Sequence, residues 1–431
     1  MSKTALNEET VSSIAGGRPI ADSAGSSRIA IYSQDDLGLG HLRRNIQICK
    51  EFLKQTPEGK GQVLLIADSP VAPFFQLPEG VDHIKLPSIR KLGAGQWQPA
   101  RLRISTPEVR QLRATLLHDA FVSYRPDLVL VDHMPGGAQG ELMPAIEALK
   151  KAHPECAIVL GLRDILDAQE VITRVWDVEG AYHVLRRYYD RVLIYGVREL
   201  FNTARIYWLP VPPGGIHYCG YVVNRDPVKP GGMPLQASVA GASLRGGPSG
   251  KLVFVSAGGG ADGHSLMQTY LAAIRLLGDR ADFTTLMALG VNSPADKSRE
   301  LVQEAEGLPV QVVPYVTDSL SQIAAANLVV CMAGYNTLSE VLSLRKKALI
   351  VPRSGPSAEQ RMRARLFAKR GLIDTIEPES LSPSELAERL LRDLERDDYP
   401  APDETIDTRG AERAAARLLE LIHERAVAVK A

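Results

Sequence analysis

A glycine-rich stretch in the second half of the chain has the composition of a phosphate-binding turn. It reads SAGGGADGH and contains Gly258, Gly259 and Gly260, between an expected strand and an expected helix. Glycines there let backbone N–H groups approach an anion, and the helix N-terminus adds its dipole. With Gly263 the stretch also matches G-x-G-x-x-G, but the next strand ends without the acidic residue that a dinucleotide site needs. We therefore expect it to bind a phosphate rather than NAD, with a plain tight turn as the alternative.

A second turn of this kind precedes a helix that we expect to open at Thr337. Its backbone N–H groups and one hydroxyl could hold another phosphate oxygen, at Gly334, Tyr335, Asn336 and Thr337. Glu340, one turn into the helix, could accept hydrogen bonds from two ribose hydroxyls. Alternatively, Thr337 and Glu340 could form a capping box, in which the glutamate only satisfies a backbone N–H. Glu359 and Gln360 follow the next strand in an expected loop, as an acceptor and an amide suited to sugar hydroxyls.

Strands that alternate with amphipathic helices position these turns. From Arg28 onwards the pattern predicts parallel sheets covered by helices on both faces. In the first half we expect strands at 28–33, 62–67, 127–132, 156–162, 191–195 and 218–222. In the second half we expect them at 251–257, 283–289, 310–313, 327–332, 348–352 and 372–376. Ligands of such sheets lie outside the carboxyl ends of the strands, which is where both glycine turns fall.

The chain divides into two α/β domains. Residues 229–250 are small and contain almost nothing that could pack a core, so we expect a flexible linker there. We predict two Rossmann-like domains with a cleft between them, over residues 28–228 and 251–408. Residues 1–27 are expected to form a disordered arm. Residues 409–431 are expected to form an amphipathic helix that packs back on the N-terminal domain.

Composition excludes several classes of protein. The 431 residues include 50 basic and 50 acidic side chains, so no net field draws the chain to nucleic acid. No apolar run approaches the roughly 18 residues of a membrane span. The first 27 residues lack the basic and apolar regions of a secretory signal. We expect the four cysteines to be buried thiols of a reducing cytoplasm, with disulfides as the alternative: Cys49, Cys156, Cys219 and Cys331.

A basic region lies between the second and third expected strands. Scattered among Pro and Gly, it contains Lys85, Arg90, Lys91, Arg101, Arg103, Arg110 and Arg113. It is either an irregular solvated surface or a patch that binds an anion or faces a membrane.

One long stretch of the chain resembles the donor domain of glycosyltransferase family 28. It begins at Val313 and reads VPYVTDSLSQIAAANLVVCMAGYNTLSEV, then, from Ala348, ALIVPRSGPSAEQRMRA. The resemblance implies the two-domain GT-B fold, with a nucleotide sugar in the cleft. It places the diphosphate at the turn 334–337, the ribose at Glu340 and the sugar at the pair 359–360. It also implies that the backbone at Val316 reads the nucleobase, usually uracil, and that the family's second glycine loop corresponds to residues 258–260.

The first half is similar to the same family at a lower level. Gly38, Gly40 and His41 stand where family 28 has a glycine-rich loop that ends in histidine and faces the cleft. Three further stretches, VDHMPGG, GLRDILD and YCGYVV, resemble a branch of uncharacterised predicted glycosyltransferases.

The chain departs from the family pattern at two positions of the donor site. Glu359 and Gln360 stand where the family has paired glutamines. Asn224 stands where it has an arginine near the linker, which leaves Arg225 as a substitute. These changes leave the donor sugar open.

Sugar transfer needs a base for the acceptor hydroxyl and groups that stabilise the departing diphosphate. Two helix N-termini could supply the second without a cation, and the chain contains no Asp-x-Asp metal signature. His41 is suited to the role of base, with a capping or phosphate contact as the alternative. Asp132 is the second catalytic candidate, since it ends a strand at the same edge. The acceptor-side candidates are Gly38, Gly40, His133, Arg163 and Asp164.

Together these features predict an inverting, metal-independent glycosyltransferase. It would move a hexose or an N-acetylhexosamine from a UDP-sugar to a hydroxyl acceptor, with no cofactor besides that co-substrate. The alternatives are a nucleotide-sugar epimerase or hydrolase of the same fold, and a non-catalytic nucleotide-sugar-binding protein. By analogy with the family, the basic region indicates a lipid-linked or anionic acceptor, reached by peripheral contact with the inner face of a membrane. No nucleic-acid partner is expected.

Overall fold

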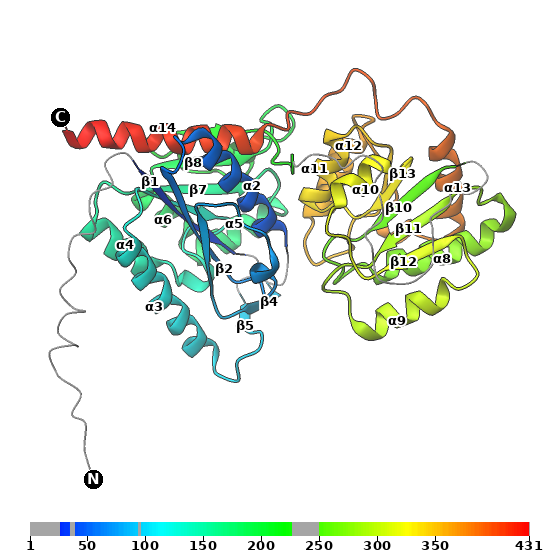
Figure 1. Ribbon diagram of the computed structural model, residues 1–431, viewed down its shortest axis with the longest axis horizontal. Coiled ribbons are helices and arrows are strands. Elements are labelled where there is room, and N and C mark those ends of the chain that lie inside the picture. The colour runs from blue at the N-terminus through cyan, green and yellow to red at the C-terminus, as the bar shows by residue number, and fades with distance from the viewer. Residues whose placement is uncertain (1–25, 35–38, 94–95, 226–249, 431) are drawn as a thin grey trace, which may run out of the picture.

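The computed structural model describes residues 26–34, 39–93, 96–225 and 250–430, which form two α/β domains side by side (Figure 1). The first domain is built on a seven-stranded parallel sheet with the strand order β3-β2-β1-β6-β7-β8-β9. Its strands are β1 (Ser27–Ser33), β2 (Gly61–Ala67), β3 (Val81–Lys85), β6 (Leu128–Asp132), β7 (Ala157–Arg163), β8 (Arg191–Tyr195) and β9 (Ile216–Tyr218). An antiparallel hairpin, β4 (Ile89–Gly93) and β5 (Gln96–Pro99), is inserted after β3.

The second domain has a six-stranded parallel sheet with the order β12-β11-β10-β13-β14-β15. Its strands are β10 (Leu252–Ser256), β11 (Thr284–Ala288), β12 (Val310–Val313), β13 (Leu328–Cys331), β14 (Ala348–Ile350) and β15 (Asp374–Thr375). The predicted fold class, two Rossmann-like domains, is confirmed.

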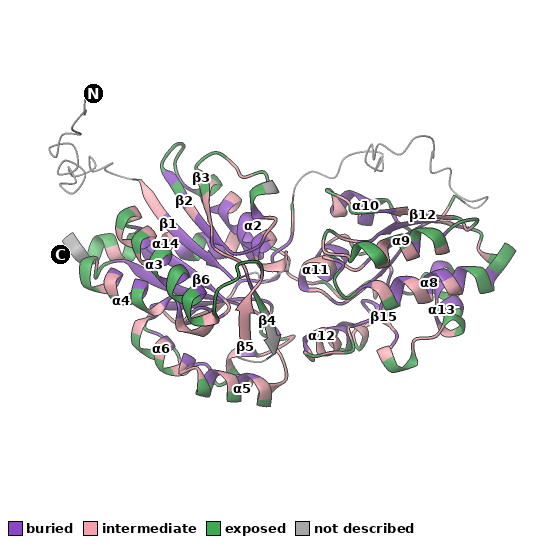
Figure 2. Ribbon diagram, turned by 90° about the horizontal axis from the view of Figure 1, so that it is seen from below, coloured by how far each residue is buried: buried purple, intermediate pink, exposed green. Residues whose placement is uncertain are grey.

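Helices cover both sheets, and their apolar faces are buried against the strands (Figure 2). In the first domain they are α2 (Gly40–Gln55), α3 (Thr106–Tyr124), α4 (Met143–Ala152), α5 (Gln169–Val178), α6 (Ala181–Tyr188) and α7 (Thr203–Ile206). In the second they are α8 (His264–Leu277), α9 (Ala295–Glu304), α10 (Ser319–Ala325), α11 (Tyr335–Ser343), α12 (Glu359–Ala368) and α13 (Pro383–Glu395). Every residue of β6 is buried, as expected for a parallel strand that is covered on both faces.

Three expected boundaries were wrong. The helix α11 opens at Tyr335 instead of Thr337, two residues earlier than expected. Glu359 and Gln360 form the first turn of α12 instead of a loop. The strand expected at 218–222 lies at 216–218, and Val222 instead forms an isolated bridge with Arg409.

Two segments that lead from one domain towards the other, 219–225 and 407–410, run side by side. Tyr221 N donates to Asp407 O at 2.8 Å, and Gly410 N donates to Tyr221 O at 2.9 Å. Gly220 has a φ of 85°, and a Cβ there would lie 2.9 Å from Asp407 O. The glycine therefore allows the two segments to run this close together. Most of the expected linker, 229–249, lies outside the described residues, as does most of the expected N-terminal arm.

The last helix, α14 (Gly410–Lys430), returns from the second crossing to the first domain, where it lies along α2 (Figure 1). Gln55 Nε2 donates to Glu412 O at 2.9 Å, and Arg191 donates to Arg417 O at 2.6 Å. Ala414 and Leu418 of α14 are buried on the face of the helix that packs against the domain. The N-terminal domain thus contains both ends of the described chain.

Two further expectations concern cysteines and membranes. All four cysteines are buried and free, as expected from their apolar surroundings. Among the described residues, no helix combines the length and the apolar composition needed to cross a bilayer.

The turn between β10 and α8 requires glycine at position 260. Gly260 has a φ of 89°, in the left-handed region that disfavours other residues. A Cβ on Gly260 would lie 2.2 Å from Leu289 O and 2.9 Å from Gly290 Cα, and backbone atoms cannot move aside as a flexible side chain can. The loop is thus pressed against the loop that follows β11.

We therefore expect Gly260→Ala to lower the melting temperature by several degrees, because it combines backbone strain with a clash. Gly334→Ala is the matched control: Gly334 has a φ of −63°, and among the described residues no heavy atom lies within 4 Å of a Cβ built there. The control should cost less than about 1 kcal/mol. Thermal melts of both variants measure the difference, and equal losses would contradict this account of the turn.

Candidate active site

The first part of the site lies where α2 begins and β6 ends. His41 is in the first turn of α2, and its Nδ1 lies 2.9 Å from Asp132 Oδ2 at the carboxyl end of β6. Asp132 is fully buried, whereas the His41 side chain is 15% exposed. The aspartate therefore lies behind the histidine ring, and only the ring can reach a ligand from solvent.

Two neighbours on α2 hold Asp132 as a carboxylate. Arg44 Nη2 donates to its two oxygens at 2.7 and 2.8 Å, and Asn45 Nδ2 donates to Oδ2 at 3.0 Å. Burial raises the pKa of Asp132, but the positive charge of Arg44, together with the hydrogen bonds from Arg44 and His41, outweighs it and holds that pKa well below its usual range. An aspartate in this state accepts hydrogen bonds and does not take up a proton near neutral pH.

The pKa of His41 is lowered from its ordinary value of 6.5. Burial is the main cause and the charges of Arg44 and Arg163 add to it, while Asp132 opposes them. The ring is therefore neutral at pH 7, the state in which it can accept a proton. His133 follows directly on β6 with a φ of 79°, and its ring centroid lies 5.5 Å from that of His41. Non-glycine residues held in this conformation cluster at functional sites.

The two glycine turns of the second domain come together. Both follow adjacent strands, β10 and β13, and a Cβ built on Gly258 would lie 3.9 Å from Thr337 Oγ1. Each turn leads into a helix of more than two turns, α8 or α11, so two helix N-termini meet at this point. Their free N–H groups and dipoles form a positive potential suited to a diphosphate.

Glu340 lies one turn into α11 and contacts the other domain. Its side chain is 2% exposed, and Arg43 Nη2 of α2 donates to Oε1 at 3.0 Å. Ser319 Oγ donates to Oε2 at 3.0 Å. Burial raises the pKa of Glu340, while Arg43 and Ser319 counteract it. No side-chain cap is described for α11, whose N-cap is Gly334, so the capping-box alternative for Glu340 was wrong.

Glu359 also contacts an arginine of the other domain. Its Oε1 accepts from Arg163 at 2.6 Å, and from Arg363 of its own helix at 2.8 Å. Burial raises the pKa of Glu359, but the two guanidinium groups bring it down to about 2. The side chain of Gln360 turns back on its own domain, where Oε1 accepts from Arg353 N at 3.2 Å.

Asp164 is part of the same network. It is buried, accepts from Tyr221 Oη at 2.6 Å, and forms an ion pair with Arg363 at 3.3 Å. Arg363 is itself buried and donates to Ala333 O at 3.0 Å. Asp164 therefore joins the domains, and its carboxylate does not face solvent as an acceptor ligand would require.

Tyr335 and Asn336 reach across the cleft from the mouth of α11. Tyr335 Oη donates to Tyr195 O at 3.0 Å and accepts from Val222 N at 3.0 Å. Asn336 Nδ2 donates to Gly40 O at 3.0 Å. Their side chains thus anchor the turn to the first domain.

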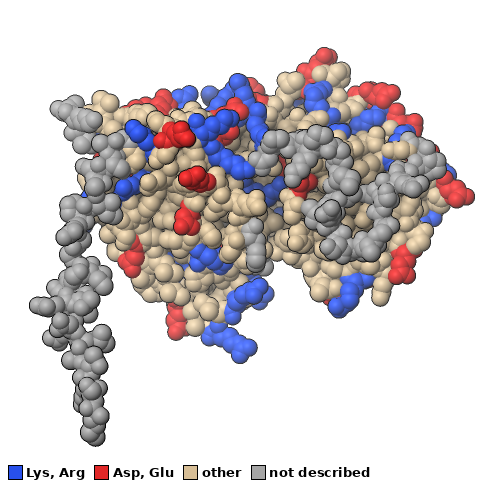
Figure 3. Space-filling view, in the orientation of Figure 1, with Lys and Arg blue, Asp and Glu red and all other residues tan. Residues whose placement is uncertain are grey.

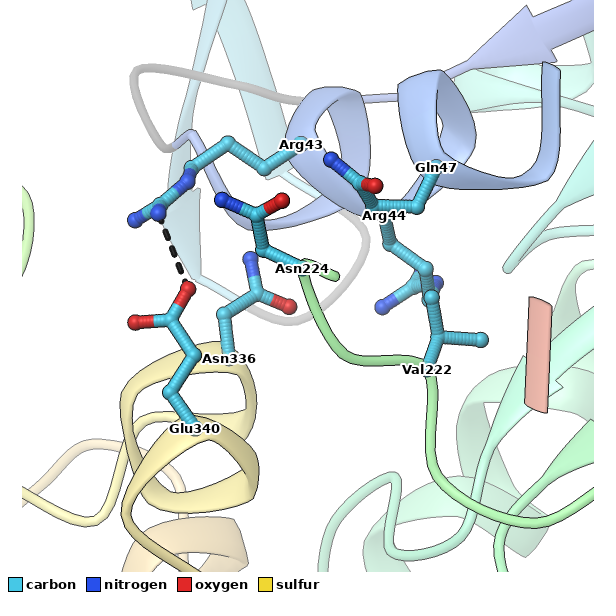
Figure 4. Close-up of a pocket in the computed structure, with 7 residues that line it drawn as sticks. All are labelled: Arg43, Arg44, Gln47, Val222, Asn224, Asn336 and Glu340. Atoms are coloured by element: carbon cyan, nitrogen blue, oxygen red, sulfur yellow. Dashed lines mark hydrogen bonds and ion pairs between the residues drawn. The ribbon is translucent and has the colours of Figure 1, made fainter. Parts of the chain in front are cut away.

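Arg43, Asn336 and Glu340 face one another across a small cavity between α2 and α11 (Figure 4). The crossing segment closes this cavity with Val222 and Asn224.

Four residues that the sequence did not single out complete the site: Arg43, Arg44, Tyr221 and Arg363. Each is charged or aromatic and lies near a predicted residue in the chain or in space. Arg43 and Arg44 directly follow His41 on α2, and that proximity was the one available signal. Nothing in the sequence marks Tyr221 or Arg363 as partners of Asp164.

Other predicted residues lie elsewhere. Arg225 is 45% exposed at the crossing and contacts Thr408 O at 3.0 Å and Glu412 at 3.4 Å. Val316 is in the loop before α10, partly buried against the core. Gly38 lies outside the described residues. Arg113, expected in the basic region, is buried and pairs with Glu141 at 2.6 Å, so it is no part of a surface patch.

Among the residues that the structure describes, no group of three or more His, Cys, Asp and Glu residues is placed to hold a metal ion.

Comparison with known proteins gives sequence matches in the second half of the chain. Residues 252–418 match the model of the glycosyltransferase family 28 C-terminal domain. An uncharacterised glycosyltransferase of Methanopyrus kandleri is 33% identical over 165 residues, which are 38% of this chain and 43% of that protein. A UDP-N-acetylglucosamine–N-acetylmuramyl-(pentapeptide) pyrophosphoryl-undecaprenol N-acetylglucosamine transferase of Brucella canis is 26% identical over 179 residues, 41% of this chain and 46% of that protein. The chain thus spans less than half the length of these relatives.

Solved structures match nearly the whole chain. MurG of Acinetobacter baumannii aligns with a TM-score of 0.52 and 14% identity, over 92% of this chain and 99% of that one. A putative UDP-N-acetylglucosamine 2-epimerase of Listeria monocytogenes aligns with a TM-score of 0.60 and 13% identity, over 93% and 96%. At these identities the likeness concerns the fold, which transferases and epimerases share. The second domain of this chain thus resembles the glycosyltransferase family 28 C-terminal domain, and the chain as a whole has the two-domain fold of these solved structures.

Proposed function

We propose that the protein is an inverting, metal-independent glycosyltransferase that moves a hexose or an N-acetylhexosamine from a UDP-sugar to a hydroxyl acceptor. The observation that carries this proposal is the meeting of the two glycine turns opposite a buried histidine–aspartate pair. The turns suit a diphosphate, and the pair suits the removal of a proton from an acceptor. The family 28 domain supports the transferase assignment.

The donor would bind mainly to the second domain. Its diphosphate would lie against the backbone N–H groups at 258–260 and 334–337, its ribose at Glu340, and its sugar at Glu359 and Gln360. The backbone at Val316 would read the base. The curated relative named for UDP-N-acetylglucosamine supports a uridine nucleotide. Metal independence is proposed because the two helix N-termini can stabilise the leaving diphosphate, and EDTA should leave the activity unchanged.

The acceptor would be activated by His41. Asp132 can only accept a hydrogen bond, so it favours the tautomer with the proton on Nδ1 and leaves Nε2 free. Nε2 takes the proton of the acceptor hydroxyl while that oxygen attacks the anomeric carbon. The bond between this carbon and the diphosphate breaks, and the helix N-termini stabilise the developing charge. A single displacement of this kind inverts the anomeric centre.

An acceptor-free incubation separates transferase from epimerase. The protein is incubated with UDP-N-acetylglucosamine, UDP-glucose or UDP-galactose, and the nucleotide sugars are analysed by NMR. A transferase should return each donor unchanged, because the second substrate is missing. An isomerised sugar would overturn the transferase proposal in favour of the epimerase alternative, whose fold is the same.

Asp132→Asn should reduce kcat/KM by about 100-fold to 10,000-fold, because an amide can donate to Nδ1 and stabilise the wrong tautomer. In the wild type, the acid limb of the pH profile should lie below pH 6.5, since the pKa of His41 is lowered from that value. Asp132 raises the pKa of His41, so any residual activity of the variant should have its acid limb at still lower pH.

Asp119→Asn is the matched control, because Asp119 Oδ1 also lies 2.9 Å from a histidine Nδ1, that of His118, but on the surface of α3. The control should keep full activity. If His41→Ala and Asp132→Ala instead left the function of the protein in the cell intact, the non-catalytic alternative would be favoured.

We propose further that the acceptor is lipid-linked or anionic and is reached by peripheral contact with a membrane. Exposed apolar side chains stand among exposed arginines on α3 and the connection before it, namely Arg101, Leu102, Arg103, Ile104, Arg110, Leu112 and Leu116. Figure 3 shows basic side chains gathered at the lower edge of the first domain, over this connection. Basic and apolar groups together favour the surface of an anionic bilayer.

This surface predicts binding to vesicles that contain anionic lipid. The double variant Arg101→Glu and Arg103→Glu should lose most of that binding in a sedimentation assay, since each basic residue contributes about 1 kcal/mol near such a surface. Arg280→Glu with Arg299→Glu makes the same charge change at exposed positions of the second domain and should bind normally. Equal binding by wild type and both variants would contradict the contact.

A further inference from the structure

The two carboxylates assigned to the hydroxyls of the donor are both held by arginines of the opposite domain. Glu340 accepts from Arg43 of α2 at 3.0 Å, and Glu359 accepts from Arg163 at the end of β7 at 2.6 Å. The sequence separations are 297 and 196 residues, so both contacts depend on how the domains meet. An ion pair between the domains therefore lies at both the proposed ribose position and the proposed sugar position.

Each arginine occupies the hydrogen-bonding capacity that a sugar would need. A pair of ribose hydroxyls requires both oxygens of Glu340, but Oε1 accepts from Arg43 and Oε2 from Ser319. A guanidinium N–H and a hydroxyl O–H both donate to carboxylate oxygens, so Arg43 and Ser319 occupy lone pairs that ribose hydroxyls would use. Because Glu340 is only 2% exposed, Arg43 must also move aside before ribose hydroxyls can reach it.

The arginines also stabilise the empty site. Glu340 and Glu359 are 2% and 8% exposed, so water alone cannot solvate their charges. A buried carboxylate without a partner costs several kcal/mol, and the guanidinium removes that cost. In contrast to the fully buried Arg44 and Arg363, Arg43 is 28% and Arg163 is 16% exposed, so both have a route to solvent when displaced.

We propose that Arg43 and Arg163 occupy the positions of the donor in the empty site and hold the two domains together there. When the donor binds, its ribose and its sugar displace them one after the other. Arg43 occupies the ribose position, and Arg163 occupies the sugar position. This inference rests on the proposed donor site. The consequence is a lower apparent affinity for the donor. Only the fraction of molecules in which the arginine has left its glutamate can bind the donor with the full intrinsic affinity.

The two positions can be tested separately because UDP contains the ribose but not the sugar. Binding of UDP and of UDP-N-acetylglucosamine is measured by calorimetry for the wild type, Arg43→Ala and Arg163→Ala. Arg43→Ala should tighten both nucleotides by about threefold to tenfold, the range of a partly exposed ion pair. Arg163→Ala should tighten UDP-N-acetylglucosamine by a similar factor and leave UDP unchanged.

Lys54→Ala is the matched control, since Lys54 is a cation of the same helix α2 that is 72% exposed and pairs with Glu51 outside the cleft. It should change neither affinity. Circular dichroism and thermal melts show whether each variant is folded. Arg43→Lys, which keeps the charge but loses the planar fork, gives a second measurement and should fall between wild type and Arg43→Ala.

The outcomes distinguish this inference from the proposed function. If Arg43→Ala binds UDP as the wild type does, or more weakly, the result contradicts the proposed displacement of Arg43 but not the proposed donor site. If Arg163→Ala tightens UDP as much as the sugar nucleotide, the assignment of separate positions is wrong. If neither nucleotide binds to the wild type or to any variant, the proposed donor site itself fails, and the inference fails with it.

Discussion

The arrangement of the two domains depends on one constraint, the pairing of buried carboxylates in each domain with arginines of the other. Glu340 and Glu359 of the second domain are almost inaccessible to water, and arginines of the first domain neutralise them. Asp164 of the first domain is neutralised in turn by Arg363 of the second. Charges buried in this way are stable only when paired, so the two domains fit together in the one arrangement that pairs them all. Tyr335 adds neutral hydrogen bonds to the same contact.

The same contact brings two kinds of chemistry together. Because α11 is anchored to α2 through Asn336 and Gly40, the helix N-termini that suit a diphosphate lie beside the helix that contains His41. Arg44 connects the two sides, since it holds Asp132 and lies 5.4 Å from the centre of the Tyr335 ring. The residue that keeps Asp132 ionised therefore also contacts the turn where the leaving group would bind.

Much of the fold could be predicted from the sequence because its signals are local. The alternation of strand and helix patterns predicted both sheets, and both glycine turns lie at the carboxyl ends of strands, as predicted. The partners of the acidic residues could not be predicted. Glu359 looked like a loop residue next to an amide, whereas it opens α12 between two arginines, one of them 196 residues away. Glu340 fitted a capping box equally well, but α11 begins two residues before Thr337, with Gly334 as its N-cap.

Hydrogen–deuterium exchange with and without UDP-N-acetylglucosamine tests the central claim most directly, that the cleft binds a nucleotide sugar at two helix N-termini. Backbone N–H groups that bind a diphosphate exchange more slowly. We predict protection of peptides that cover 258–260 and 334–340, and no change in α9 (Ala295–Glu304) of the same domain. Unchanged exchange at both turns under saturating nucleotide, or protection confined to α9, would contradict the account.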